Sequence, residues 1–181
     1  MTGTAQRPLL FLDVDGPLIP FGAASQQYPT YQVDFQSPGD DANPLLDRIN
    51  PDHGPRLLAL SCELVWATTW MADANKCISP RIGLPQLEVV TWPEPSEADE
   101  HDERNRLHWK TRALVDWAAG CPFAWVDDEI TDTDRAWVSA HHPGPALLHR
   151  VDPRQGLTDA DYAALNKWLS GTRITPSPGA P

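Results

Sequence analysis

The sequence is poor in basic residues. Its 181 residues contain 14 Lys and Arg against 25 Asp and Glu, which gives a formal net charge of −11. Proteins that bind long nucleic acids rely on clustered Lys and Arg, so this balance argues against a broad polyanion-binding surface. The charge balance does not argue against binding of the end of a nucleotide chain.

The sequence also has little cysteine and no long hydrophobic run. Cys62, Cys77 and Cys121 are odd in number and lack a C-x-x-C spacing, which indicates buried free thiols rather than a disulfide framework or a zinc site. No apolar run approaches the ~20 residues that a membrane-spanning helix needs. The N-terminus does not resemble a signal peptide. We therefore expect a cytoplasmic protein with no membrane partner.

Short apolar runs alternate with helical patterns along the chain. Strands are expected at 9–12, 63–67, 87–92, 123–126 and 146–151. Helices are expected from Pro55 to Leu60, at about 72–78, between Lys110 and Gly120, at about 134–140, and at about 159–169 with Thr158 as the cap. This alternation predicts an α/β fold with an open sheet, in which ligands bind outside the carboxyl ends of the strands.

The remaining segments suggest one domain with irregular excursions. We expect the domain to span residues 1–170 and the segment 171–181, GTRITPSPGAP, to be a disordered tail. Residues 20–45 read as an irregular flap with a weak tendency toward a hairpin, since Tyr28, Tyr31, Val33 and Phe35 alternate loosely. The acidic stretch PEPSEADEHDE is expected to be a solvated loop.

Acidic residues follow two of the predicted strands. Asp13 and Asp15 come after the run LLFL, and Asp127 and Asp128 come after FAWV. If the two strands are parallel neighbours, these four carboxylates converge at one edge of the sheet, where their mutual repulsion calls for a cation. Ligands made of oxygen alone favour Mg²⁺ over Zn²⁺.

This set of residue types suits phosphoryl transfer. Asp13 would attack phosphorus and form an aspartyl-phosphate, and Asp15 would serve as general acid and then as general base. The hydroxyl of Thr68 and the ammonium group of Lys110 would stabilise charge on the phosphoryl oxygens. Seen alone, D-x-D-G also occurs in ordinary turns and calcium loops, but calcium loops do not begin with a buried strand.

The residues resemble the haloacid dehalogenase-like (HAD) superfamily over about residues 9–170. The four motifs of that family are matched in order by Leu9 to Gly16, by LVWAT, by Lys110 and by WVDDE. The resemblance implies a three-layer, Rossmann-like fold around a mostly parallel five-stranded sheet. It also implies the site residues, which are Asp13 and Asp15 for catalysis, Thr68 or Thr69 with Lys110 at the phosphate, and Asp13, Asp15, Asp127 and Asp128 at Mg²⁺.

Three further features narrow the resemblance. Asp15 is the second acid that dehalogenases lack, so the chain is similar to the phosphatase branch. The segments WATTW, HWK and WVDDE are similar to a HAD subgroup found in bacterial RNA-repair proteins. The intervals between the motifs are too short for a large cap domain, which implies an open site for bulky substrates, or a lid supplied by another subunit of a homo-oligomer.

The sequence thus predicts a Mg²⁺-dependent phosphatase acting on a phosphorylated substrate, such as a nucleotide or another bulky phosphate. A noncatalytic HAD-like binding module and a phosphotransferase with an acceptor other than water are the alternatives. Two choices stay open, namely Thr68 or Thr69 at the phosphate and Asp127 or Asp128 as the direct metal ligand, with Thr68 and Asp128 preferred. Four other residues receive lesser roles: Trp70 packing or lining the entrance, His108 at the surface, His142 at a helix end and Asn75 in local helix hydrogen bonds.

Overall fold

The centre of the protein is a five-stranded sheet. The computed structural model describes residues 7–32, 43–94, 102 and 104–172. The strand order is β3-β2-β1-β4-β5, and every pairing is parallel. The strands are β1 (Leu9–Leu12), β2 (Glu63–Trp66), β3 (Glu88–Val89), β4 (Phe123–Asp127) and β5 (Ala146–Arg150). The sheet predicted to be mostly parallel is therefore wholly parallel.

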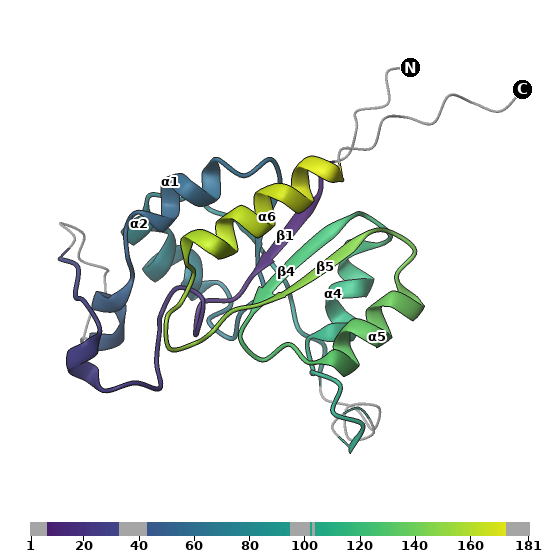
Figure 1. Ribbon diagram of the computed structural model, residues 1–181, viewed down its shortest axis with the longest axis horizontal. Coiled ribbons are helices and arrows are strands. Elements are labelled where there is room, and N and C mark those ends of the chain that lie inside the picture. The colour runs from purple at the N-terminus through teal and green to yellow at the C-terminus, as the bar shows by residue number, and fades with distance from the viewer. Residues whose placement is uncertain (1–6, 33–42, 95–101, 103, 173–181) are drawn as a thin grey trace, which may run out of the picture.

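Helices cover both faces of the sheet and make three layers (Figure 1). One face carries α1 (His53–Leu58), α2 (Ser79–Ile82) and α6 (Asp159–Gly171), and the other carries α4 (Thr111–Ala118) and α5 (Asp132–His141). The remaining turns of helix are the 3₁₀ segments η1 (Ser25–Gln27) and η2 (Pro44–Arg48) and the π-helical segment η3 (Ala74–Ile78).

Strand β1 lies at the centre of two hydrophobic layers. Leu10 and Leu12 pack toward α1, α2 and α6, whereas Leu9 and Phe11 pack toward α4 and α5. A central parallel strand is buried on both faces, which explains why the sequence shows an unbroken apolar run here instead of an alternating one. Burying each such side chain is worth about 1.5–3 kcal/mol relative to leaving it exposed.

The helices begin and end close to their predicted positions, with three differences. Helix α1 starts at His53, so Pro55 stands inside its first turn, where a missing N–H costs no hydrogen bond. The helix predicted at 72–78 is a π-helical segment that continues as α2 to Ile82 and ends at Gly83, whose φ is +71°. Helix α6 extends to Gly171, one residue into the predicted tail, and residues 173–181 lie outside the described part.

No strand lies in the described part of the flap, residues 20–32 and 43–45, so the hairpin tendency finds no support there. Tyr28 and Tyr31 lie in coil after η1, while Val33 and Phe35 fall outside the described residues. Most of the acidic stretch PEPSEADEHDE also falls outside them. No cap domain stands over the sheet within the described ranges.

Two further expectations concern the thiols and membrane spans. Cys62 and Cys121 are buried and Cys77 is half-buried, and all three are free thiols. Within the described ranges, every helix is too short or too polar to cross a bilayer.

Candidate active site

The strand register brings the ends of three strands to one level. Leu12 of β1 is paired with Trp66 of β2 and with Val126 of β4. The residues that follow these partners therefore emerge together at the carboxyl edge of the sheet. The predicted site residues Asp13, Thr68 and Asp127 all belong to this edge.

Lys110 lies between two of the carboxylates. Its Nζ donates hydrogen bonds to Oδ2 of Asp13 and to Oδ2 of Asp127, each at 2.8 Å. The lysine side chain is only 2% exposed, and Asp127 is fully buried. Burial opposes the charge on Lys110, but the two carboxylates outweigh it and hold the lysine pKa above its usual value. The ammonium group therefore stays charged.

Asp13, Asp127 and Asp128 form an acidic cluster. One carboxylate oxygen from each lies within 4.8 Å of the others. Burial raises the pKa of Asp13 to about 7, with Lys110 acting against it and Asp127 adding to it. Burial and the neighbouring Asp127 raise the pKa of Asp128 to about 6. One lysine does not balance three acids, and an all-oxygen donor set suits a hard divalent cation, so the cluster could hold a metal.

The two acids of the fourth motif have different surroundings. Oδ2 of Asp127 accepts hydrogen bonds from Lys110 and, at 3.2 Å, from Nε1 of Trp125, while its Oδ1 accepts from the backbone N–H of Glu129 at 3.0 Å. Both oxygens of Asp127 are thus held by protein donors. The side chain of Asp128 packs instead against the loop after β1.

Gly16 makes that packing of Asp128 feasible. Its φ is +89°, and a Cβ built on it would lie 2.6 Å from Cγ of Asp128. Such a distance is well inside van der Waals contact, so a side chain at position 16 would displace the carboxylate. The glycine of the D-x-D-G motif is therefore required both by its backbone conformation and by the close approach of Asp128.

Asp15 lies beyond the three-carboxylate cluster. It sits in the turn after β1, where it forms an isolated bridge with Ile19, and its Oδ2 accepts a hydrogen bond from Nε1 of Trp70 at 3.0 Å. The cluster with mutually close oxygens does not include Asp15. Its role as a metal ligand stays a prediction, and the structure instead gives its side chain a partner from the loop after β2.

Thr68 and Thr69 differ sharply in exposure. Thr68 is fully buried, and its Oγ1 accepts a hydrogen bond from the backbone N–H of Trp70 at 3.3 Å. Its carbonyl oxygen accepts from Nε1 of Trp92 at 3.2 Å. Thr69 is exposed. Thr68 is thus the threonine that is fixed in place, and which of the two contacts a phosphate stays a prediction.

Residues 9–162 match the family model described as the HAD domain in Swiss Army Knife RNA repair proteins. This chain belongs to that HAD family. No curated protein and no solved structure matches the chain significantly. The match confirms the resemblance to the RNA-repair HAD subgroup, and the five-stranded parallel sheet agrees with the fold that this resemblance implies.

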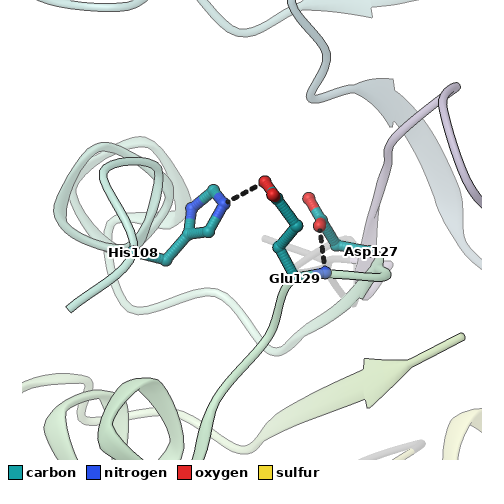
Figure 2. Close-up of side chains that lie close together, drawn as sticks. All are labelled: His108, Asp127 and Glu129. Carbon is teal, nitrogen blue, oxygen red and sulfur yellow. Dashed lines mark hydrogen bonds and ion pairs between the residues drawn. The ribbon is translucent and has the colours of Figure 1, made fainter. Parts of the chain in front are cut away.

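A second group of side chains supports Lys110 in this HAD domain. His108, Asp127 and Glu129 bring one ligand atom each within 4.8 Å of the others (Figure 2). Nδ1 of His108 accepts a hydrogen bond from the backbone N–H of Lys110 at 3.1 Å, so the proton is on Nε2, which lies 3.1 Å from Oε2 of Glu129. These ligand atoms already have hydrogen-bond partners. The group therefore holds Lys110 in position.

His108 was predicted to be a surface residue, and this is wrong. Its side chain is 7% exposed, and its ring contacts Trp109 and Trp125. Its backbone N–H donates to Oδ1 of Asp134 at 2.7 Å, and the same oxygen accepts from the hydroxyl of Thr111 at 2.7 Å. Asp134 also closes the capping box of α5 with Thr131. The loop that carries Lys110 is therefore fixed to the start of α5.

Two other predicted roles concern residues away from the cluster. His142 is the C-cap of α5, as expected of a helix end, and its Nε2 lies 3.1 Å from the carbonyl oxygen of Cys121. Asn75 does more than bond within its own helix. Its Oδ1 accepts from Nε1 of Trp66 and from the N–H of Leu87, and its Nδ2 donates to the carbonyl oxygen of Leu87. Asn75 thus ties η3 to β2 and to the segment before β3.

Proposed function

We propose that this HAD domain is a Mg²⁺-dependent phosphomonoesterase that works through an aspartyl-phosphate on Asp13. The observation that carries the proposal is the position of Lys110, whose Nζ contacts Asp13 and Asp127 at 2.8 Å beside Asp128. A nucleophilic carboxylate, a fixed positive charge and a cluster suited to a divalent cation are the three parts that phosphoryl transfer needs.

The reaction has two steps. A carboxylate oxygen of Asp13 attacks phosphorus, the bond to the leaving oxygen breaks, and Asp15 gives that oxygen a proton. Asp15 then removes a proton from water, the resulting hydroxide attacks the aspartyl-phosphate, and Asp13 and inorganic phosphate are released. The hydrogen bond from Trp70 orients Asp15 for both proton transfers.

The surrounding groups stabilise charge during these steps. The ammonium of Lys110 and the hydroxyl of Thr68 offer donors to the phosphoryl oxygens. Asp13 and Asp128 would hold the metal, with Asp127 positioning Lys110 and lying near enough to join them. When bound, Mg²⁺ neutralises charge on the nonbridging phosphoryl oxygens.

The substrate is proposed to be a bulky phosphate at the end of a nucleotide chain. The site is at a sheet edge that no cap covers within the described residues, so it can admit a large molecule. The family description refers to RNA repair proteins, which favours a phosphorylated RNA end. Hydrolysis at one end needs only local contacts and is compatible with the net charge of −11.

An Asp13→Asn variant tests the chemistry. Wild-type protein should hydrolyse p-nitrophenyl phosphate only when Mg²⁺ is present, and D13N should lose this activity by a factor of about 10³ or more because the amide is a poor nucleophile. Asp116→Asn, at an exposed position on α4, is the matched control and should keep wild-type turnover. Wild-type turnover by D13N would disprove the proposal.

Beryllium fluoride separates an enzyme from a binding module. With Mg²⁺, it should raise the melting temperature of the wild type, because its adduct with Asp13 mimics the aspartyl-phosphate, and it should not raise that of D13N. Absence of both the shift and turnover would favour the noncatalytic module. Release of p-nitrophenol in excess of inorganic phosphate, when an alcohol is added, would identify a phosphotransferase.

A further inference from the structure

A cleft of about 520 Å³ opens at the same edge of the sheet as the acidic cluster. Its walls come from three segments that are distant in sequence, namely residues 17–31 after β1, residues 48–56 around the start of α1, and residues 154–159 between β5 and α6. In a parallel α/β sheet these are loops and helix starts at the carboxyl ends of strands. Its volume is within the range of cavities that bind small ligands.

One wall of the cleft is the catalytic loop itself. Pro17 and Leu18 line the cleft, and Pro17 is two residues after Asp15, a span of at most about 7 Å along the backbone. The carbonyl oxygen of Pro17 accepts a hydrogen bond from the N–H of Leu157 at 2.9 Å, and a Cβ on Gly156 would lie 3.0 Å from the same oxygen. The cleft therefore borders the loop that carries Asp13 and Asp15.

The cleft is basic although the protein is acidic. Arg48, Arg56 and Arg154 line it, and Asp159 is the one acidic residue among its lining residues. Asp159 pairs with Arg56 at 2.8 Å but its side chain is 95% exposed, so solvent screens this pair. Burial lowers the pKa of His53, another lining residue, to about 4, so it is neutral at physiological pH.

The arginines of the cleft are not equally available. Arg48 stacks over Tyr28 with its Cζ 4.4 Å from the ring centre, and its Nη1 donates to the carbonyl oxygen of Pro20 at 2.9 Å. Arg56 stacks over Tyr162 with its Cζ 3.9 Å from the ring centre. Arg154 is exposed, and in the described part of the chain no carboxylate forms an ion pair with it. Arg154 is the arginine with a guanidinium available for a ligand.

We propose that this cleft binds a second phosphate of the substrate, the phosphodiester next to the terminal phosphate of a nucleotide chain, with Arg154 as its principal contact. The inference rests on the proposed function, because the terminal phosphate must occupy Asp13. Arginine suits this task since its planar fork contacts two phosphate oxygens at once. Tyr31, which is half-buried in the cleft wall, offers a ring on which the adjoining base or ribose can pack.

The experiment compares two kinds of substrate, without and with a second phosphate, in the wild type and three variants. The substrates are p-nitrophenyl phosphate, which has no second phosphate, and the dinucleotides pApA and ApAp, which carry a terminal phosphate beside a phosphodiester. Arg154→Ala should lower kcat/KM for the preferred dinucleotide about 10-fold and leave that for p-nitrophenyl phosphate within about 2-fold. Arg154→Glu should lower the dinucleotide value further, because it adds repulsion.

Lys167→Ala is the matched control. It removes one exposed positive charge from α6, nine residues from the capping Thr158 and thus about 13 Å along the helix from the cleft. It should leave both substrates within about 2-fold of the wild type. If Lys167→Ala weakens the dinucleotide as much as Arg154→Ala does, the effect is one of net charge and the cleft proposal is wrong.

The other outcomes of the experiment also test the cleft proposal, the phosphatase proposal or both. An equal loss for both substrates, or no loss for the dinucleotides, would overturn the cleft proposal. Turnover of p-nitrophenyl phosphate without turnover of either dinucleotide would overturn it and leave the phosphatase standing, whereas no turnover of any substrate would reject both. The last substrate is a sugar bisphosphate. If Arg154→Ala lowers kcat/KM for this substrate alone, the second phosphate does not belong to a nucleotide chain.

Discussion

The indole Nε1 of Trp70 donates a hydrogen bond to Oδ2 of Asp15 at 3.0 Å. The bond joins the loop after β2 to the loop after β1, across 55 positions of sequence. In the proposed mechanism Asp15 transfers a proton in both steps, so its carboxylate must stay in one orientation while its charge changes. Trp70 acts on the reaction through Asp15 and is a positioning residue.

Trp70→Phe should therefore slow the reaction most where the leaving group needs a proton. We expect kcat to fall about 10-fold for an alkyl phosphate and less than about 3-fold for p-nitrophenyl phosphate, whose leaving group departs unprotonated. Trp137→Phe, on α5, is the control and should change neither value. Equal losses with the two substrates would show that Trp70 shapes the site without positioning the acid.

Lys110→Met should both destabilise the protein and abolish activity. It leaves Asp13 and Asp127 buried without their shared cation, a loss of about 3–5 kcal/mol in the free energy of unfolding for a broken buried ion pair. Added Mg²⁺ should restore part of the lost free energy of unfolding but should not restore turnover. Lys167→Met, at an exposed position, should have little effect on either. Denaturant unfolding with and without Mg²⁺ measures this, and an unchanged midpoint for Lys110→Met would contradict it.

Gly16→Ala should displace Asp128 and weaken Mg²⁺ binding. The new methyl group would overlap the carboxylate, and the positive φ adds backbone strain, so we expect about 1–3 kcal/mol of destabilisation and at least a 10-fold loss of Mg²⁺ affinity. Gly83→Ala is the matched control, since Gly83 also has a positive φ but has open space around its Cβ position. Calorimetric Mg²⁺ titration should show normal affinity for Gly83→Ala, and a normal affinity for Gly16→Ala would refute the steric argument.

His53 should make stability depend on pH. Burial lowers its pKa to about 4, whereas in the unfolded chain it is near 6.5, so the unfolded state binds more protons between these values. Stability from this group is full above pH 6.5 and is lost as the pH falls toward 4, by about 3 kcal/mol. In the Mg²⁺-free protein, Asp13 and Asp128 act in the opposite direction, because their raised pKa values favour the folded state as pH falls.

A comparison of variants isolates the histidine from those carboxylates. The difference in melting temperature between the wild type and His53→Gln should shrink between pH 7 and pH 4.5, because the acids contribute equally to both proteins. His141→Gln, at an exposed position on α5, should follow the wild type over the whole range. If melting temperature depends on pH in the same way for the wild type and for His53→Gln, the prediction that His53 is buried in its neutral form is wrong.

The sequence carried enough local information to predict the sheet and the acids at its edge. An apolar run followed by Asp13 is a signal that needs no tertiary contact, and the same is true of the run before Asp127. Lys110 was predicted from its charge at the start of a helix and from its match to a family motif, and its Nζ lies 2.8 Å from a carboxylate oxygen of Asp13 and of Asp127. The features predicted best from the sequence, the strands and the acids that follow them, are those that depend mainly on residues adjacent in the chain.

The contacts that sequence missed all join distant residues. The ring of His108 contacts that of Trp125, 17 positions further along the chain, and the sequence around His108 does not indicate this contact. The bond from Trp70 to Asp15 and the joining of Asn75 to β2 depend on how the loops fold over the sheet. Arg48, Arg56 and Arg154 are scattered single arginines in an acidic chain, and the fold alone gathers them around one cleft.

The common level at which β1, β2 and β4 end has an evolutionary consequence. The position of Asp13 relative to Thr68 and Asp127 is determined by the pairing of Leu12 with Trp66 and Val126 inside a buried sheet, where a one-residue slip would turn each side chain to the other face. The loops and short helical segments beyond that edge carry the arginines and tyrosines of the cleft. Under the proposed function, insertions and substitutions in these segments would alter which phosphate ester is accepted without disturbing the catalytic residues, so a lineage of such domains could change substrates while keeping one reaction.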